Sequence, residues 1–167
     1  MYDNILVIAD QDVDQRAALQ KARSIAISDD SNITVLGFVS AAKADAVDAR
    51  RASLEQAAAE EFHGMNQVKC DVVSTDDIAA YCKTYTQEHG MDLVIKTGHR
   101  TESMFHTPLD FQLVRELKCA VMISTLEKWR AKKNVMVTID IESDNSAQIA
   151  LNKKVAQWAK GWADKLG

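Results

Sequence analysis

Five short apolar runs, each of strand length, lie along the first three quarters of the chain. They are rich in β-branched residues and several are nearly continuous, which is typical of strands covered by helices on both faces. The runs occupy positions 5–9, 33–39, 68–73, 93–95 and 121–123. Residues 41–62, rich in Ala, Arg and Glu, predict one long helix between two of them. Strands that alternate with helices indicate an α/β fold with a parallel sheet.

Two further helices carry recognisable start signals. Ser74 with Asp77 three residues later reads as a capping pair before an amphipathic stripe. Thr107 reads as the cap of another helix, with Pro108 in the first turn and Asp110 at the third position. Both helices are therefore expected to begin at these residues.

The chain contains an internal repeat. NILVIAD at 4–10 reappears as NVMVTID at 134–140, and a similar helical pattern follows each copy. In the second copy, an apolar stripe at helical spacing is formed by Leu151, Val155, Trp158 and Trp162. We therefore expect a domain at 1–127, a linker at 128–133, and at 134–167 the first strand and helix of a second, truncated domain.

Composition excludes several classes of function. With 47% hydrophobic and 26% charged residues, the 167-residue chain is typical of globular domains. A net charge of −4 without a basic stripe argues against nucleic acid as a partner. No apolar run reaches membrane-spanning length and no signal peptide is recognisable, so a membrane is not expected and a cytoplasmic location is. Cys70, Cys82 and Cys119 contain no CxxC pair, which indicates neither a disulfide framework nor a zinc site.

Residues 10–13 raise an enzymatic alternative. Asp10, Asp12 and Val13 after an apolar strand spell the DxDxV start of haloacid-dehalogenase-type phosphatases, in which the first Asp attacks phosphorus. The later acid pair that would hold magnesium is missing from the expected strand end. A calcium loop at the same acids lacks its central glycine, which is Gln15 here. We expect no enzymatic activity and no catalytic residue.

The segment 91–124, MDLVIKTGHRTESMFHTPLDFQLVRELKCAVMIS, resembles the universal stress protein family. The resemblance extends over residues 2–124, and with the repeat it is most similar to the tandem universal stress protein E group. It implies an open five-stranded parallel sheet with helices on both faces, of the adenine nucleotide alpha hydrolase-like type. In family members that bind adenine nucleotide, the positions matching Asp10 and Val39 contact the ligand.

The phosphate-binding loop of ATP-binding members is degenerate here. Of its glycines only Gly98 remains, while Thr101, Phe111 and Gln112 would put side chains where phosphate oxygens need room. Asp110, in the first turn of a helix, would also oppose an anion. ATP is therefore possible as a cofactor but not expected.

The remaining polar residues at this end of the fourth strand define the candidate site. His99 and Arg100 follow Gly98 and could receive a small anionic ligand, so the predicted ligand-binding residues are Asp10, Val39, Gly98, His99 and Arg100. No metal site is predicted, because His99 and His106 have no placed third ligand.

These features predict a stress-response protein that acts by binding a small ligand, by pairing of domains, or by both. Loss of the loop glycines favours pairing, and the residues retained around Gly98 favour a ligand. Residues 134–166 would leave a strand edge and an apolar stripe uncovered. We expect them to pair with another chain, in a homo-oligomer such as a dimer or with the remainder of the second domain, or to fold back on the first domain.

Overall fold

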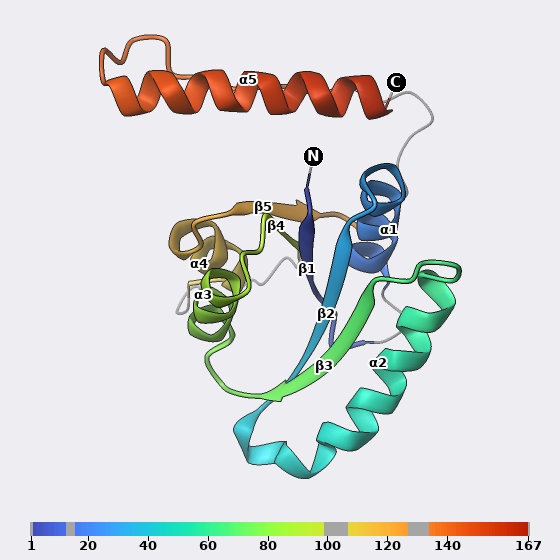
Figure 1. The fold of residues 1–167 in the computed structure, drawn as a ribbon. Coiled ribbons are helices and arrows are strands. Elements are labelled where there is room, and N and C mark those ends of the chain that lie inside the picture. The colour runs from blue at the N-terminus through green and yellow to red at the C-terminus, as the bar shows by residue number, and fades with distance from the viewer. Residues whose placement is uncertain (1, 13–15, 99–106, 127–133, 167) are drawn as a thin grey trace. The chain divides into compact units, whose positions relative to one another are not determined.

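The computed structural model describes residues 2–12, 16–98, 107–126 and 134–166, and its chain forms two compact units (Figure 1). One unit spans residues 2–127 and the other residues 128–167.

The first unit is built on a five-stranded parallel sheet. Its strands are β1 (Asn4–Ile8), β2 (Asn32–Val39), β3 (Val68–Ser74), β4 (Leu93–Thr97) and β5 (Ala120–Ser124). They lie in the order β3-β2-β1-β4-β5, and every neighbouring pair is parallel. The predicted α/β class and the open parallel sheet are confirmed.

Helices cover both faces of this sheet (Figure 1). On one face, α1 (Ala17–Asp29) and α2 (Val47–Glu61) pack against the strands, and on the other lie α3 (Ile78–Glu88) and α4 (Leu109–Glu116). Side chains of successive strand residues point to opposite faces, so Leu6 and Ile8 meet α3 and α4. The core is therefore two-sided, which accounts for the continuous apolar strands.

Three of the predicted helix boundaries were wrong. Residues 41–62 form a 3-10 helix (η1, Ala41–Ala46) before α2, and Lys43 inside it has non-helical dihedrals. Ser74 ends β3, whereas Asp77 is the actual cap of α3, its carboxylate accepting a hydrogen bond of 2.9 Å from the Ala80 amide. At α4 the capping position belongs to Pro108, without a side-chain hydrogen bond. A sequence signal for capping thus marked the region but not the residue.

The second unit consists of one long helix, α5 (Ser146–Leu166), after an extended segment. Residues 134–140, expected as a strand, have no regular secondary structure. A β-strand needs backbone hydrogen bonds to a neighbouring strand. In the described part of the chain, no strand pairs with residues 134–140. Its last residue instead binds the helix, because the Asn152 side chain donates to the Asp140 carbonyl.

Among the helices that the structure describes, none is long and apolar enough to cross a membrane.

Candidate functional site

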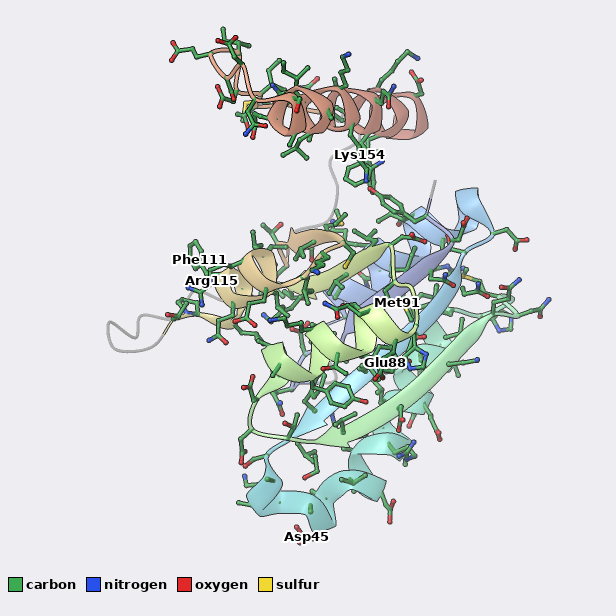
Figure 2. The ribbon with its side chains drawn as sticks, turned by 60° about the vertical axis from the view of Figure 1, so that its left-hand side comes forward. Asp45, Glu88, Met91, Phe111, Arg115 and Lys154 are labelled. Atoms are coloured by element: carbon green, nitrogen blue, oxygen red, sulfur yellow. The ribbon has the colours of Figure 1, made fainter. Side chains whose placement is uncertain are left out.

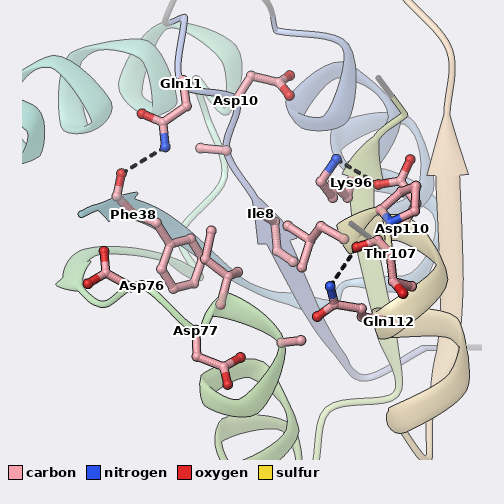
Figure 3. Close-up of a pocket in the computed structure, with 15 residues that line it drawn as sticks. Ile8, Asp10, Gln11, Phe38, Asp76, Asp77, Lys96, Thr107, Asp110 and Gln112 are labelled. Carbon is pink, nitrogen blue, oxygen red and sulfur yellow. Dashed lines mark hydrogen bonds and ion pairs between the residues drawn. The ribbon is translucent and has the colours of Figure 1, made fainter. Parts of the chain in front are cut away.

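The candidate site lies where the strand order reverses. From β1 the chain passes to β2 on one side, whereas β4 is its neighbour on the other, so the carboxyl ends of β1 and β4 flank a topological switch point. A cavity of about 500 Å³ opens there (Figure 3). We call it the switch-point cleft; it is lined by Ile8, Ala9, Asp10, Gln11, Phe38, Asp76, Asp77, Ile78, Ala79, Lys96, Thr107, Pro108, Leu109, Asp110 and Gln112.

One wall of the cleft is apolar and rigid. Ile8 and Phe38 come from the ends of β1 and β2 and are almost fully buried. The Phe38 ring meets Tyr81 of α3 edge-on, with ring centroids 5.8 Å apart and the planes at 77°. Gln11, after β1, is linked to β2 because its side-chain amide donates a hydrogen bond of 3.1 Å to the Phe38 carbonyl. This wall can receive the apolar body of a ligand without rearranging.

Asp10 is held in place from two sides. It lies two residues after the end of β1 and is only 6% exposed. The Thr97 hydroxyl, at the end of β4, donates a hydrogen bond of 2.7 Å to the Asp10 carboxylate. Arg50 of α2 donates to the Asp10 backbone carbonyl, and burial lowers the pKa of Arg50 while the charges of Asp10 and Asp12 counter that shift. Asp10 is thus a fixed, buried acceptor at the switch point.

A partly buried ion pair lines the cleft, and Figure 3 shows both of its side chains. The Lys96 ammonium lies 2.8 Å from the Asp110 carboxylate and donates a hydrogen bond of 2.6 Å to the Thr97 carbonyl. Its side chain is only 9% exposed. The pair joins the end of β4 to the first turn of α4.

The sequence reasoning missed Lys96 and treated Asp110 as an isolated charge. The apolar run that indicates this strand covers only positions 93–95, and Lys96 follows it inside β4, which continues to Thr97. The available signal was a lysine in an otherwise apolar strand, two residues after Val94 and therefore on the same face. Because a buried ammonium group needs a partner, such a lysine indicates a buried ion pair or hydrogen bond. Asp110 therefore faces a cation, which corrects its interpretation as an uncompensated charge.

Two further acids line the cleft and stabilise the structure beside it. Asp76 accepts hydrogen bonds from the Ser40 hydroxyl at 2.7 Å and from the Ala41 amide at 3.1 Å. Asp77 caps α3. These contacts tie the turn after β2 to the turn after β3, so the rim of the cleft is built from two strand ends.

The predicted site residues have different positions. Asp10 lines the cleft, but Val39 and Gly98 are not among the residues that the structure places along it. The Val39 carbonyl accepts a hydrogen bond of 2.9 Å from the Thr75 amide. His99 and Arg100, like His106 and Thr101, lie outside the described residues.

Gly98 has a packing reason to be glycine. Its amide donates a hydrogen bond of 2.8 Å to the Ser124 carbonyl, which draws it against β5. A Cβ at this position would lie 2.7 Å from the Ile123 Cγ2 atom and 3.5 Å from an Asp110 carboxylate oxygen. Any side chain here would push against β5, next to the ion pair.

Phe111 and Gln112, both expected to obstruct the phosphate position, behave differently. Phe111, labelled in Figure 2, is 70% exposed and does not line the cleft, so its predicted obstruction is wrong. Gln112 does line it, and its side-chain amide donates a hydrogen bond of 2.7 Å to the Thr107 carbonyl. Successive helix residues diverge by about 100°, which is why only one of the two can face the cleft.

The cysteines belong to the packing of the domain. Burial raises the pKa of Cys82 to about 12 and that of Cys70 to about 11, so both stay protonated at neutral pH. The described residues contain no cluster of three or more His, Cys, Asp or Glu side chains suited to a metal ion.

Comparisons with known proteins give one curated relative and many structures. No family model matches the chain. Universal stress protein E of Photorhabdus laumondii is 28% identical over 78 residues, which make up 45% of this chain and 25% of that protein. The matched part is thus about a quarter of the relative's length.

Three of the structural matches share the fold at 11–22% sequence identity. A universal stress protein in complex with cAMP has a TM-score of 0.62 at 14% identity and covers 75% of this chain and 98% of its own. UspA from Lactobacillus plantarum has a TM-score of 0.58 at 22% identity, covering 73% and 97%. The protein from Archaeoglobus fulgidus in complex with dAMP has a TM-score of 0.58 at 11% identity, with the same two coverages. These matches show that the chain has the fold of the universal stress proteins and that 78 of its residues resemble one of them in sequence.

Proposed function

We propose that this chain is a cytoplasmic, non-enzymatic stress-response protein whose switch-point cleft binds a small molecule with an adenine-type ring. The observation that carries the proposal is the cavity of about 500 Å³ at the switch point of the sheet. Open α/β sheets bind ligands at this position, outside the carboxyl ends of the strands. An apolar wall at Ile8 and Phe38 faces fixed polar groups at Asp10 and Lys96, which suits a flat, partly polar ring.

The structural neighbours support an adenine-type ligand. Two of them are described in complex with cAMP and with dAMP, and both share the fold of this chain. ATP fits less well, because the chain keeps only one of the loop glycines that let backbone amides approach the phosphates. Binding without turnover is supported by the acids of the cleft, since Asp10, Asp76 and Asp77 all accept hydrogen bonds that fix the local structure.

Pairing is the second candidate, and it rests on the second unit. Met136 is 89% exposed and Ile141 is 83% exposed, although both come from an apolar segment. Exposed apolar segments of this kind are typical of surfaces that associate with another chain. The partner would be a second copy of this chain or further sequence of the same family.

A ligand carried through purification would test the proposal most directly. Native mass spectrometry should show a noncovalent adduct, or one formed on adding adenosine, AMP or ATP, and it reports the oligomeric state in the same spectrum. Ile78 lines the cleft and is only half-buried, so Ile78→Trp should fill the cavity and abolish the adduct. Ile78→Val leaves the cavity open and should retain it.

A negative result in these spectra would contradict ligand binding at the cleft. If none of the three compounds binds and the Ile78→Trp variant has the same spectrum as the parent protein, the cleft is not a ligand site. A dimer in that spectrum would then leave pairing as the function.

A further inference from the structure

We propose that the switch-point cleft selects an uncharged ligand of nucleoside type over its phosphorylated form, because Asp110 already occupies the place of an anion at the start of α4. The inference rests on the proposed function, in that it assigns the ligand class of the same cleft. It concerns the charge of the ligand and not its ring.

The start of α4 offers a phosphate fewer free backbone amides than most helix amino termini do. Helix amino termini attract anions through unpaired backbone amides. Pro108, at the capping position, has no N–H group, and its carbonyl accepts hydrogen bonds from the amides of Phe111 and Gln112 at 3.1 and 3.2 Å. The Asp110 carboxylate belongs to this first turn, so the protein supplies its own negative charge there.

The one cation among the described lining residues of the cleft, Lys96, is already paired. The Lys96 ammonium contacts the Asp110 carboxylate at 2.8 Å and the Thr97 carbonyl at 2.6 Å, with a side chain that is 91% buried. A phosphate could replace Asp110 at Lys96 only by separating an ion pair whose lysine is buried, which is strongly unfavourable, and at the remaining N–H group it would lie beside the Asp110 carboxylate. Two of the three ammonium N–H groups are used, and the third can donate to a hydroxyl or ring nitrogen of a neutral ligand.

The remaining charges of the cleft act in the same direction. Besides Asp110, its described lining residues include Asp10, Asp76 and Asp77, whereas Lys96 is the one cation among them. Like charges in a partly enclosed cavity repel more strongly than they do in water. A nucleoside would keep the apolar contacts with Ile8 and Phe38 without meeting this repulsion.

Isothermal titration calorimetry with adenosine and AMP tests the inference, because these probes differ only in the phosphate. The parent protein should bind adenosine at least about tenfold more tightly than AMP. Asp110→Asn removes the carboxylate charge and frees the Lys96 ammonium, so AMP should gain about tenfold while adenosine changes little. Glu88→Gln removes the same charge at the far end of α3, outside the cleft, and should keep the parental ratio.

The parent protein alone provides a second measurement, which does not depend on the folding of any variant. The disadvantage of AMP should shrink as salt is raised from 0.05 to about 0.5 M, because salt screens the repulsion. Equal affinity for both probes in the parent protein, or an unchanged ratio in a folded Asp110→Asn variant, would overturn the inference but leave ligand binding intact. If neither adenosine nor AMP bound, the proposed function would be overturned, and the inference with it.

Discussion

Residues 4–8 and residues 134–138 have closely similar side-chain patterns, yet they occupy opposite environments. Val7 lies in the middle of the sheet, paired with Val35 on one side and Ile95 on the other, and it is fully buried. Val137, its counterpart in the repeat, is 38% exposed in a segment without regular structure. The strand at β1 is thus a property of its neighbours as much as of its own residues.

The polar ends of the two copies show the same contrast. Asp10 is buried at the cleft and accepts a hydrogen bond from Thr97 of another strand. Asp140 is exposed, and its backbone carbonyl binds Asn152 of the adjoining helix. An acid at the end of a strand becomes part of a site only when a second strand supplies its partner.

The two units can be followed separately by spectroscopy. The tyrosines, Tyr2, Tyr81 and Tyr85, all lie in residues 2–127, and the tryptophans, Trp129, Trp158 and Trp162, all lie in residues 128–167. Tyrosine and tryptophan signals therefore report on different units of one chain.

The largest difference is expected for the same substitution in the two copies. Val7→Ala should lower the free energy of unfolding of residues 2–127 by about 2–3 kcal/mol, through lost burial and a cavity between two strands. Val137→Ala should cost less than about 0.5 kcal/mol, as is usual for an exposed site. Urea titrations measure both values, followed by tyrosine near-UV circular dichroism for Val7→Ala and by tryptophan fluorescence for Val137→Ala.

Equal costs for the two valines would contradict the contrast between the copies. They would mean that residues 134–140 are buried in solution, for example against a second chain. Repeating the titrations at several protein concentrations tests that explanation directly, because a paired state becomes more stable as concentration rises.

A methyl group added to a glycine should have opposite effects in the two units. Gly98→Ala forces a Cβ to within 2.7 Å of Ile123 Cγ2 and should destabilise residues 2–127 by about 1–2 kcal/mol in thermal unfolding. Gly161 lies inside α5, where alanine should stabilise the helix by about 0.5–1 kcal/mol. Far-UV circular dichroism detects the gain in helix.

The matched control for Gly98→Ala removes the Ile123 Cγ2 atom with which the new Cβ would clash. Ile123→Leu lacks the Cγ2 methyl at nearly constant volume, so the double variant Gly98→Ala/Ile123→Leu should recover part of the lost stability. If the two effects were simply additive, the contact between Gly98 and β5 would not be the cause.

The smallest difference is expected at the helix caps. Asp77 caps α3 through the Ala80 amide, and Asn145 binds the Ala147 amide at the start of α5, both at 2.9 Å. Alanine at either position should cost about 1 kcal/mol. Asp77→Ala should lower the midpoint of the tyrosine signal, because α3 packs on the sheet, whereas Asn145→Ala should mainly increase fraying of α5 in hydrogen exchange.

An Asp77→Asn variant serves as the control for the first cap, since asparagine caps helices as well as aspartate does. A loss of stability in Asp77→Asn as large as that in Asp77→Ala would show that the charge of Asp77, and not its cap, stabilises this end of α3.

Local patterns predicted much of the first unit. Apolar runs located all five strands within a few residues, because a strand covered on both faces must be apolar at nearly every position. Asp10 could be placed at the site because it directly follows such a strand. Lys96 could not be predicted as the partner of Asp110, because their contact depends on how far β4 extends and where α4 begins.

The sequence by itself determined the composition of each element: which segments are apolar enough for a buried strand, which form helices, and that 134–140 repeats 4–10. Only the tertiary structure decided which copy of the repeat forms a strand, and that Lys96 and Asp110 form an ion pair at the cleft. The physical reason is that backbone hydrogen bonds between strands and buried ion pairs are interactions between distant segments. Local propensity can favour them, but only the assembled sheet brings their partners together.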